Sequence, residues 1–123
     1  MKKNEDVCDC NPINEEIVRD TIKKLPEEEL FKELAIFYKL LGDVTRAKIL
    51  FAIDTNEMCV NDISNVVQMS KSSVSHQLSD LKRAGIVKSR KDGKEVYYSL
   101  DDDHVKGLFE LGIEHIDHKR NER

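Results

Sequence analysis

Three of the four histidines of this 123-residue chain lie near its C-terminal end, directly after a run of aspartates. Asp102 and His104 form an Asp-x-His pair, and His115 and His118 form a His-x-x-His pair further along. Three imidazole nitrogens and one carboxylate oxygen are a donor set that suits tetrahedral zinc. The pattern predicts metal binding, and the competing interpretation is that these are ordinary surface residues near a chain end.

The same segment is predicted to form an α-helix from about residue 102 to 118, because acidic residues favour a helix start. One stripe is apolar or small at spacings of three and four: Val105, Leu108, Phe109, Gly112 and Ile116. His104 and His115 then share a face but lie ~16 Å apart along the axis, so one ion cannot reach both. Two antiparallel copies would bring the Asp-x-His end of one to the His-x-x-His end of the other. We therefore expect two inter-subunit zinc sites in a homodimer. Because helix starts are uncertain, two neighbours remain alternatives to Asp102: Asp101 and Asp103.

Charge is distributed unevenly along the chain. The net charge is -4, yet residues 71–100 hold seven Lys and Arg against three Asp and Glu, a local charge of +4. Residues 1–34 and 101–123 are acidic. A basic region inside an acidic protein is typical of a local contact with a polyanion such as DNA. The alternative is an ordinary solvated face.

A short helix, a turn and a longer helix are predicted over about residues 61–84, which is a helix-turn-helix pattern. The expected buried side is Ile63, Val66 and Val67 in the first helix and Val74, Leu78 and Leu81 in the second. Gly85 suits the left-handed end of the second helix. The remaining face is short and polar, which would let this helix enter a major groove: Ser72, Ser73, Ser75, His76, Ser79 and Lys82.

Two strand-like runs follow over about residues 86–100, separated by Asp92-Gly93, a dipeptide typical of a two-residue hairpin turn. Such a hairpin is the wing of a winged helix, and its basic residues can contact phosphates: Arg90, Lys91 and Lys94. The expected fold is mainly α with a small β-hairpin. It is a winged helix-turn-helix, homodimeric through its N-terminal and C-terminal helices.

Residues 1–14 are predicted to form a mobile arm with Cys8 and Cys10, and residues 15–123 a single domain. A short helix should end at Pro26 and a second should run to Gly42. A third, capped by Asp43, should bury Ala47, Leu50 and Phe51 with Ile49 or Ile53. Because the three cysteines are an odd set and the first two are closely spaced, reduced thiols are expected.

Composition excludes several classes of protein. No apolar run reaches the ~18 to 20 residues of a membrane span, and no signal peptide follows the first residues, so we expect a cytoplasmic protein without a membrane partner. No nucleophile elbow, phosphate loop or His-Glu-x-x-His motif is present. An enzyme with a small organic substrate is therefore not expected.

Five ordered blocks resemble the ArsR/SmtB family of bacterial metal-responsive repressors over roughly residues 30–118: "LGDVTRAKIL", "MCVNDIS", "SSVSHQLSDLKRAGIV", "DGKEVYYSL" and "DDDHVKGLFELGIEHIDH". The last block is similar to the subgroup that senses zinc and cobalt through the C-terminal helices. The resemblance implies a repressor that leaves double-stranded operator DNA when Zn(II) binds, with Cd(II), Pb(II) or Co(II) as alternative effectors, and that controls metal efflux or resistance genes. The implied sensing ligands are Asp102, His104, His115 and His118, and the residues implied to face DNA are Lys71, Ser72, Ser75 and His76.

A second metal site is implied by relatives in which cysteines of the arm join a Cys-x-Cys pair. Here Cys59 is kept and Asn61 replaces the second cysteine of that pair. The resulting candidate site for a soft ion is Cys8, Cys10, Cys59 and Asp62. The alternatives are a buried apolar role for Cys59 and an unordered tail for the arm.

Two rival interpretations keep the winged helix but change the signal. In one, the repressor responds to thiol oxidation through Cys8, Cys10 and Cys59, and the histidines are incidental. In the other, zinc is a structural clamp of the dimer, and its addition leaves operator affinity unchanged.

Overall fold

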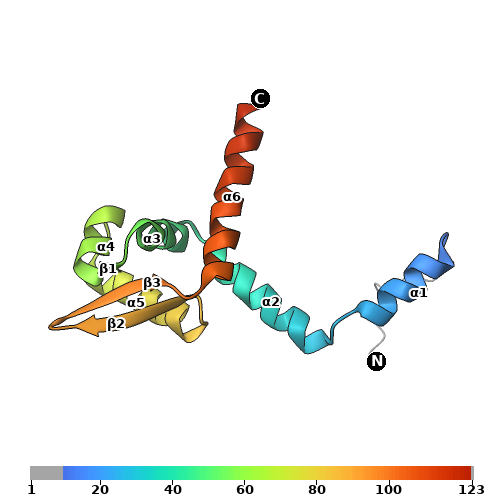
Figure 1. Cartoon of the computed structure of the whole chain (residues 1–123), viewed down its shortest axis with the longest axis horizontal. Helices are drawn as coiled ribbons and strands as arrows, with labels where there is room; N and C mark the ends of the chain where they lie inside the picture. Colours follow the sequence, from blue (N-terminus) through green and yellow to red (C-terminus); the bar gives the residue numbers. More distant parts are fainter. Residues whose placement is uncertain (1–9, 123) are drawn as a thin grey trace. The chain divides into compact units, whose positions relative to one another are not determined.

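The computed structural model describes residues 10–122, in two compact units that divide the sequence between Leu34 and Ala35. The elements are α1 (Glu15–Lys24), α2 (Glu28–Leu41), α3 (Val44–Thr55), β1 (Met58–Cys59), α4 (Val60–Val67), α5 (Lys71–Arg83), β2 (Val87–Asp92), β3 (Glu95–Leu100) and α6 (Asp103–Asn121). Figure 1 shows them coloured along the sequence. In the described range, no helix is both long and apolar enough to cross a bilayer. The domain boundary predicted after residue 14 stays a prediction, and Cys8 lies outside the described residues.

The first unit contains α1 and the start of α2. Asn14 caps α1, because its side-chain oxygen accepts a hydrogen bond from the backbone N–H of Ile17 at 3.0 Å. The helix ends before Pro26, and α2 begins after it, as predicted. No described residue of this unit is buried.

The second unit holds the hydrophobic core, which the three helices α3, α4 and α5 build with the sheet. Asp43 caps α3 by accepting from the backbone N–H of Arg46 at 3.0 Å, as predicted. The fully or nearly fully buried core residues are Ile49, Leu50, Ile53, Ile63, Val74, Leu78, Leu81, Ile86, Val87, Leu100 and Val105. The stripe predicted for α5 is therefore confirmed, since all three of its residues are completely buried.

Two residues predicted to be buried are not. Phe51 is 52% exposed and Val66 is 55% exposed. Both lie on helix faces turned away from the core, where they line an apolar hollow together with the C-terminal helix. Helical spacing groups apolar residues correctly but does not distinguish the face that covers the core from a second apolar face.

The sheet has three antiparallel strands in the order β1-β3-β2, where the sequence predicted only a two-stranded hairpin. Strand β1 has two residues, too few to show an alternating pattern. Because Asp92 pairs with Glu95, the two turn residues are Gly93 and Lys94, not the predicted Asp92 and Gly93. Gly93 has a φ of +65°, which suits the first position of a tight hairpin turn.

Helix α6 extends three residues beyond its predicted end, to Asn121, and Asp102 is its N-cap. Its first turns pack on their own chain, since Val105 is buried and Phe109 contacts the core. The first turns of this helix therefore cover the core of their own chain, in addition to any contact with a second copy. Beyond them it rises away from the sheet (Figure 1) and leaves Leu111 and Ile116 exposed.

Candidate nucleic-acid interface and metal centre

The turn between α4 and α5 sets the direction of the second helix. Gln68 ends α4 in the left-handed conformation, with a φ of 58°. Two residues later Ser70 caps α5, because its hydroxyl oxygen accepts from the backbone N–H of Ser73 at 3.1 Å. Gly85 then ends the helix region with a φ of +75°, as predicted.

The polar face of α5 is available to a ligand. All of the predicted contact residues on this helix are exposed: Lys71, Ser72, Ser73, Ser75, His76, Ser79 and Lys82. Lys82 donates to the hydroxyl of Ser89 on β2 at 2.7 Å, and Nε2 of His76 lies 3.7 Å from a carboxylate oxygen of Asp80. Most of these side chains are small, so DNA can approach the helix closely.

Helix α5 is also fixed from the other side. Nε of Arg46, on α3, donates to the amide oxygen of Gln77 at 2.8 Å. No spacing rule marks this contact in the sequence, because the two residues are 31 positions apart. The contact and the buried stripe together hold the exposed face of α5 in one orientation.

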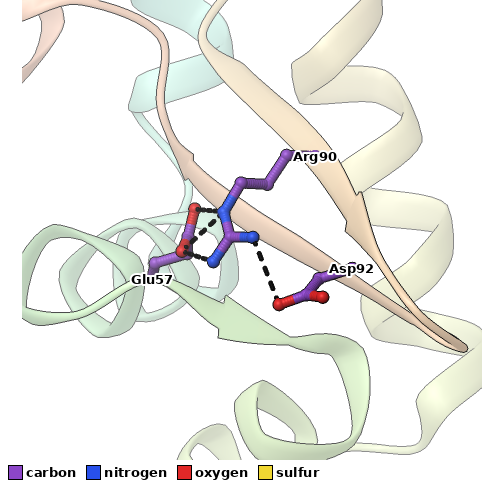
Figure 2. Close-up of polar contacts among 3 residues, drawn as sticks. All are labelled: Glu57, Arg90 and Asp92. Atoms are coloured by element: carbon purple, nitrogen blue, oxygen red, sulfur yellow. Dashed lines mark hydrogen bonds and ion pairs between the residues drawn. The ribbon is translucent and has the colours of Figure 1, made fainter.

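The three basic residues predicted on the wing differ in their surroundings. Lys91 and Lys94 are exposed at the tip. Arg90 instead points toward Glu57, whose two carboxylate oxygens both accept from its Nε at 2.9 Å, with Asp92 beside it (Figure 2). These hydrogen bonds lower the pKa of the Glu57 carboxyl below its ordinary value of 4.5.

Asp102 and His104 lie together at the start of α6. One carboxylate oxygen of Asp102 accepts from the backbone N–H of Val105 at 2.9 Å, and this bond lowers the pKa of the carboxyl. Its other oxygen lies 3.6 Å from Nδ1 of His104, whose side chain is 97% exposed. The same carboxylate therefore caps the helix and leaves one oxygen beside an imidazole.

His115 and His118 lie on the exposed C-terminal half of α6. Nε2 of His118 is 3.1 Å from a carboxylate oxygen of Glu122. Since α6 is continuous from Asp103 to Asn121, the two donor pairs do not meet within one chain. Across the described residues, no group of three or more His, Cys, Asp and Glu side chains is placed to hold a metal ion. The donors are nonetheless exposed nitrogen and oxygen atoms of the types that zinc accepts.

The residues of the second candidate site are not gathered in the described part of the chain. Cys59 is buried and free, and Asp62 is exposed on α4. Cys10 is disulfide-bonded, in contrast to the reduced thiol expected from the sequence. A sulfur in a disulfide has no thiolate to offer a metal.

One further link joins α6 to the core. Nζ of Lys106 lies 2.7 Å from a carboxylate oxygen of Asp54 at the end of α3, and the Asp54 side chain is only 9% exposed. This hydrogen bond raises the pKa of Lys106. The two residues are 52 positions apart, so no spacing rule could have paired them.

Comparison with known proteins gives consistent matches. The family model described as bacterial regulatory protein, arsR family, matches residues 43–89. A cadmium resistance transcriptional regulatory protein CadC homolog from Staphylococcus aureus is 41% identical over 89% of this chain and 91% of its own length. A transcriptional repressor SmtB homolog from Synechocystis sp. is 34% identical over 89% of this chain and 83% of its own.

A solved structure shares the architecture. It is a homodimeric winged helix-turn-helix DNA-binding domain from Mycobacterium bovis, determined by NMR in solution. It has a TM-score of 0.73 at 27% identity and covers 77% of this chain and 88% of its own. The helix-turn-helix and wing described above are therefore those of a known DNA-binding fold.

Proposed function

This chain belongs to the ArsR family of bacterial regulatory proteins, and we propose that it is a homodimeric repressor that releases operator DNA when Zn(II) binds. As a member of this family, it is a transcriptional regulator and not an enzyme. The observation that carries the proposal is the arrangement of α6, whose two pairs of zinc-type donors are held at opposite ends of one continuous helix. Cd(II), Pb(II) and Co(II) are alternative effectors.

Operator DNA would contact the exposed face of α5 and the tip of the wing. Serine and histidine side chains of α5 suit base edges and phosphates in a major groove, and lysines suit phosphates. The proposed contact residues are Lys71, Ser72, Ser73, Ser75, His76, Ser79, Lys82, Lys91 and Lys94. The protein would act in the cytoplasm, where operator DNA is found.

A second copy of the chain is the proposed partner of the apolar surface. A hollow of about 890 Å³ lies between α6 and the faces of α3 and α4 that carry Phe51 and Val66. Ile116 lines this hollow and is 59% exposed, and Leu111, on the same helix, is a further exposed apolar residue. Such a surface is typical of a protein interface, and the related domain from Mycobacterium bovis is a homodimer.

The proposed zinc sites lie between two antiparallel α6 helices. Asp102 and His104 of one copy would share an ion with His115 and His118 of the other, which gives two equivalent sites. Bound Zn(II) supplies a tetrahedral cross-link between the helices. Since imidazole must be neutral to ligate, zinc binding should weaken in acid.

The cross-link would favour a relative orientation of the two α5 helices that does not match successive major grooves. By linkage, zinc lowers the affinity for DNA by the same factor by which DNA lowers the affinity for zinc. The corresponding coupling free energy is typically ~1 to 3 kcal/mol. A repressor released in this way suits the control of metal efflux or resistance genes.

The proposal is tested by fluorescence anisotropy of a labelled DNA duplex that the wild-type protein has selected from a random pool. Zinc should lower the affinity of the wild type, and the double variant His104→Ala/His115→Ala should keep its DNA affinity but lose this response. Equal release of both proteins by zinc would contradict the assigned ligands. Tight DNA binding that zinc leaves unchanged would indicate a structural clamp.

A second candidate is a thiol-responsive repressor, and the observation that favours it is the disulfide at Cys10. The soft-ion site of Cys8, Cys10, Cys59 and Asp62 would require that disulfide to be reduced. The same titration on a cysteine-free variant separates these functions. If an oxidant or Cd(II) releases DNA from the wild type but not from the cysteine-free variant, and this variant also fails to respond to zinc, the cysteines are the sensing residues.

A further inference from the structure

One ion pair joins the wing to the body of the winged helix across the full width of the sheet. Arg90 lies on β2, at one edge, and Glu57 directly precedes β1, at the other edge. Nε of Arg90 donates to both carboxylate oxygens of Glu57 at 2.9 Å. Its Nη2 atom is also hydrogen-bonded to Glu57, so the carboxylate is held by two nitrogens of the guanidinium (Figure 2).

The register of the strands explains how this contact is made. Arg90 pairs with Tyr97 on β3, and Tyr97 pairs with Cys59 on β1. Because side chains alternate between faces, Glu57, two residues before Cys59, lies on the same face. The guanidinium carbon of Arg90 lies 5.0 Å from the centre of the Tyr97 ring, so the arginine crosses β3 over this ring.

The positive charge of the Arg90 guanidinium is balanced by carboxylates on more than one side. Besides Glu57, Asp92 places a carboxylate oxygen 3.6 Å from Nη1. Because the positive charge of this guanidinium is largely neutralised by two carboxylates, it attracts a phosphate only weakly. Lys91 and Lys94 are exposed at the tip and are better placed to make that contact.

We propose that Arg90 is a positioning residue, which with Glu57 fixes the wing on the sheet so that Lys91 and Lys94 meet DNA phosphates. This inference rests on the proposed DNA binding. Strand β1 pairs with β3 through only two residues and has no pairing with β2, so the ion pair is a direct restraint between the two edges. Without it the wing would occupy more positions, and binding would cost more ordering entropy.

The deciding experiment is an exchange of charges in the full-length protein. Arg90→Glu alone places two carboxylates together and should free the wing, which lowers affinity for a duplex that the wild type has selected from a random pool. The double variant Glu57→Arg/Arg90→Glu recreates the pair in reverse and should bring the affinity back to within about threefold of wild type. If Arg90 contacts a phosphate itself, the double variant stays as weak as Arg90→Glu, and the proposal is overturned.

Salt dependence gives an independent reading of the same question. The slope of log affinity against log salt should stay unchanged in Arg90→Gln and become shallower by about 1.8 in Lys91→Gln, because each phosphate contact contributes about 0.9 and the proposed homodimer loses two contacts. Lys119→Gln, which removes one positive charge from α6, is the matched control and should keep the wild-type slope. A change of about 1.8 in the slope for Arg90→Gln, as expected if both copies of Arg90 contact a phosphate, would overturn the proposal.

Amide hydrogen exchange of β2 and β3 tests the restraint without DNA. Protection should fall in Arg90→Glu and return in the double variant. Unchanged protection in Arg90→Glu would overturn the proposal even if the protein binds DNA well. If the wild type selects no duplex, the proposed DNA-binding function fails, while the exchange measurement still decides whether the pair restrains the wing.

Discussion

Helix α5 buries Val74, Leu78 and Leu81 completely, whereas α6 buries only Val105 and leaves Leu111 and Ile116 exposed. The exposed polar face of α5 is therefore held in place by contacts within one chain. Two of the four donors of α6, His115 and His118, lie beyond the part of the helix that the core supports. Under the proposed function, each chain would therefore present a finished DNA-contacting face, whereas the metal site would depend on a second copy.

The largest expected effect separates the two helices by stability. Leu78→Ala should lower the free energy of unfolding by about 2–5 kcal/mol, because it leaves a cavity in a fully buried site. Leu111→Ala is the matched control, since Leu111 is 63% exposed. It should weaken self-association, measured by sedimentation equilibrium, more than it destabilises the fold in urea. Equal loss of unfolding free energy in both variants would remove the contrast.

The ion pair between Lys106 of α6 and Asp54 of α3 should matter more for the effect of zinc on DNA affinity than for zinc binding or DNA binding alone. Lys106→Gln removes the ion pair with Asp54. Zinc affinity and DNA affinity, each measured alone, should change little, but the effect of zinc on DNA affinity should shrink by about 2-fold to 30-fold. Lys119→Gln, on the same helix, should leave the coupling unchanged. If Lys106→Gln responds to zinc as the wild type does, this contact carries no coupling.

A smaller effect is expected at the start of α5. Ser70→Ala removes the cap of this helix and should lower the free energy of unfolding by about 1 kcal/mol. Ser70→Asp keeps a capping oxygen and should retain most of the stability. Thermal unfolding followed by circular dichroism measures both variants, and a loss as large in Ser70→Asp as in Ser70→Ala would rule out capping as the cause.

The smallest effect is a pH dependence of the wing. Hydrogen bonds from Arg90, and then the charges of Arg90 and Lys88, lower the pKa of Glu57 from 4.5. The restraint is thus fully present above that value and is lost as the pH falls through the lowered pKa of the folded protein. Amide exchange of β2 and β3, corrected for intrinsic rates and followed as the pH is lowered from neutral, should show the loss in wild type below the ordinary carboxyl range. Glu57→Gln should show no such step.

Local sequence rules predicted the helices and their ends well. The capping by Asp43, the buried stripe of α5 and the left-handed Gly85 follow from spacing and residue type alone. The contacts of Arg90 with Glu57 and of Lys106 with Asp54 do not, because they join residues 33 and 52 positions apart. Such pairs are set by the packing of the chain, and neither residue type nor spacing marks them in advance.

The candidate metal donors show a different limit. Their types and spacing predict a site shared between two chains, and the structure of one chain agrees with the spacing, since α6 is continuous between them. Phe51 and Val66 were predicted as core and instead face the apolar hollow beside α6. An apolar pattern identifies a helix face that favours contact with other apolar side chains. It does not show whether those side chains belong to the same chain or to a partner.

Complementation between two defective variants tests the shared site most directly. One variant lacks Asp102 and His104 (Asp102→Asn/His104→Ala), and the other lacks His115 and His118 (His115→Ala/His118→Ala). Neither homodimer should bind zinc tightly. In a mixed dimer the intact Asp102 and His104 of one chain meet the intact His115 and His118 of the other, so mixing the variants should restore one tight site per mixed dimer. A mixture in which mixed dimers form, yet which binds no more zinc than the two variants measured separately, would contradict a site built from two chains.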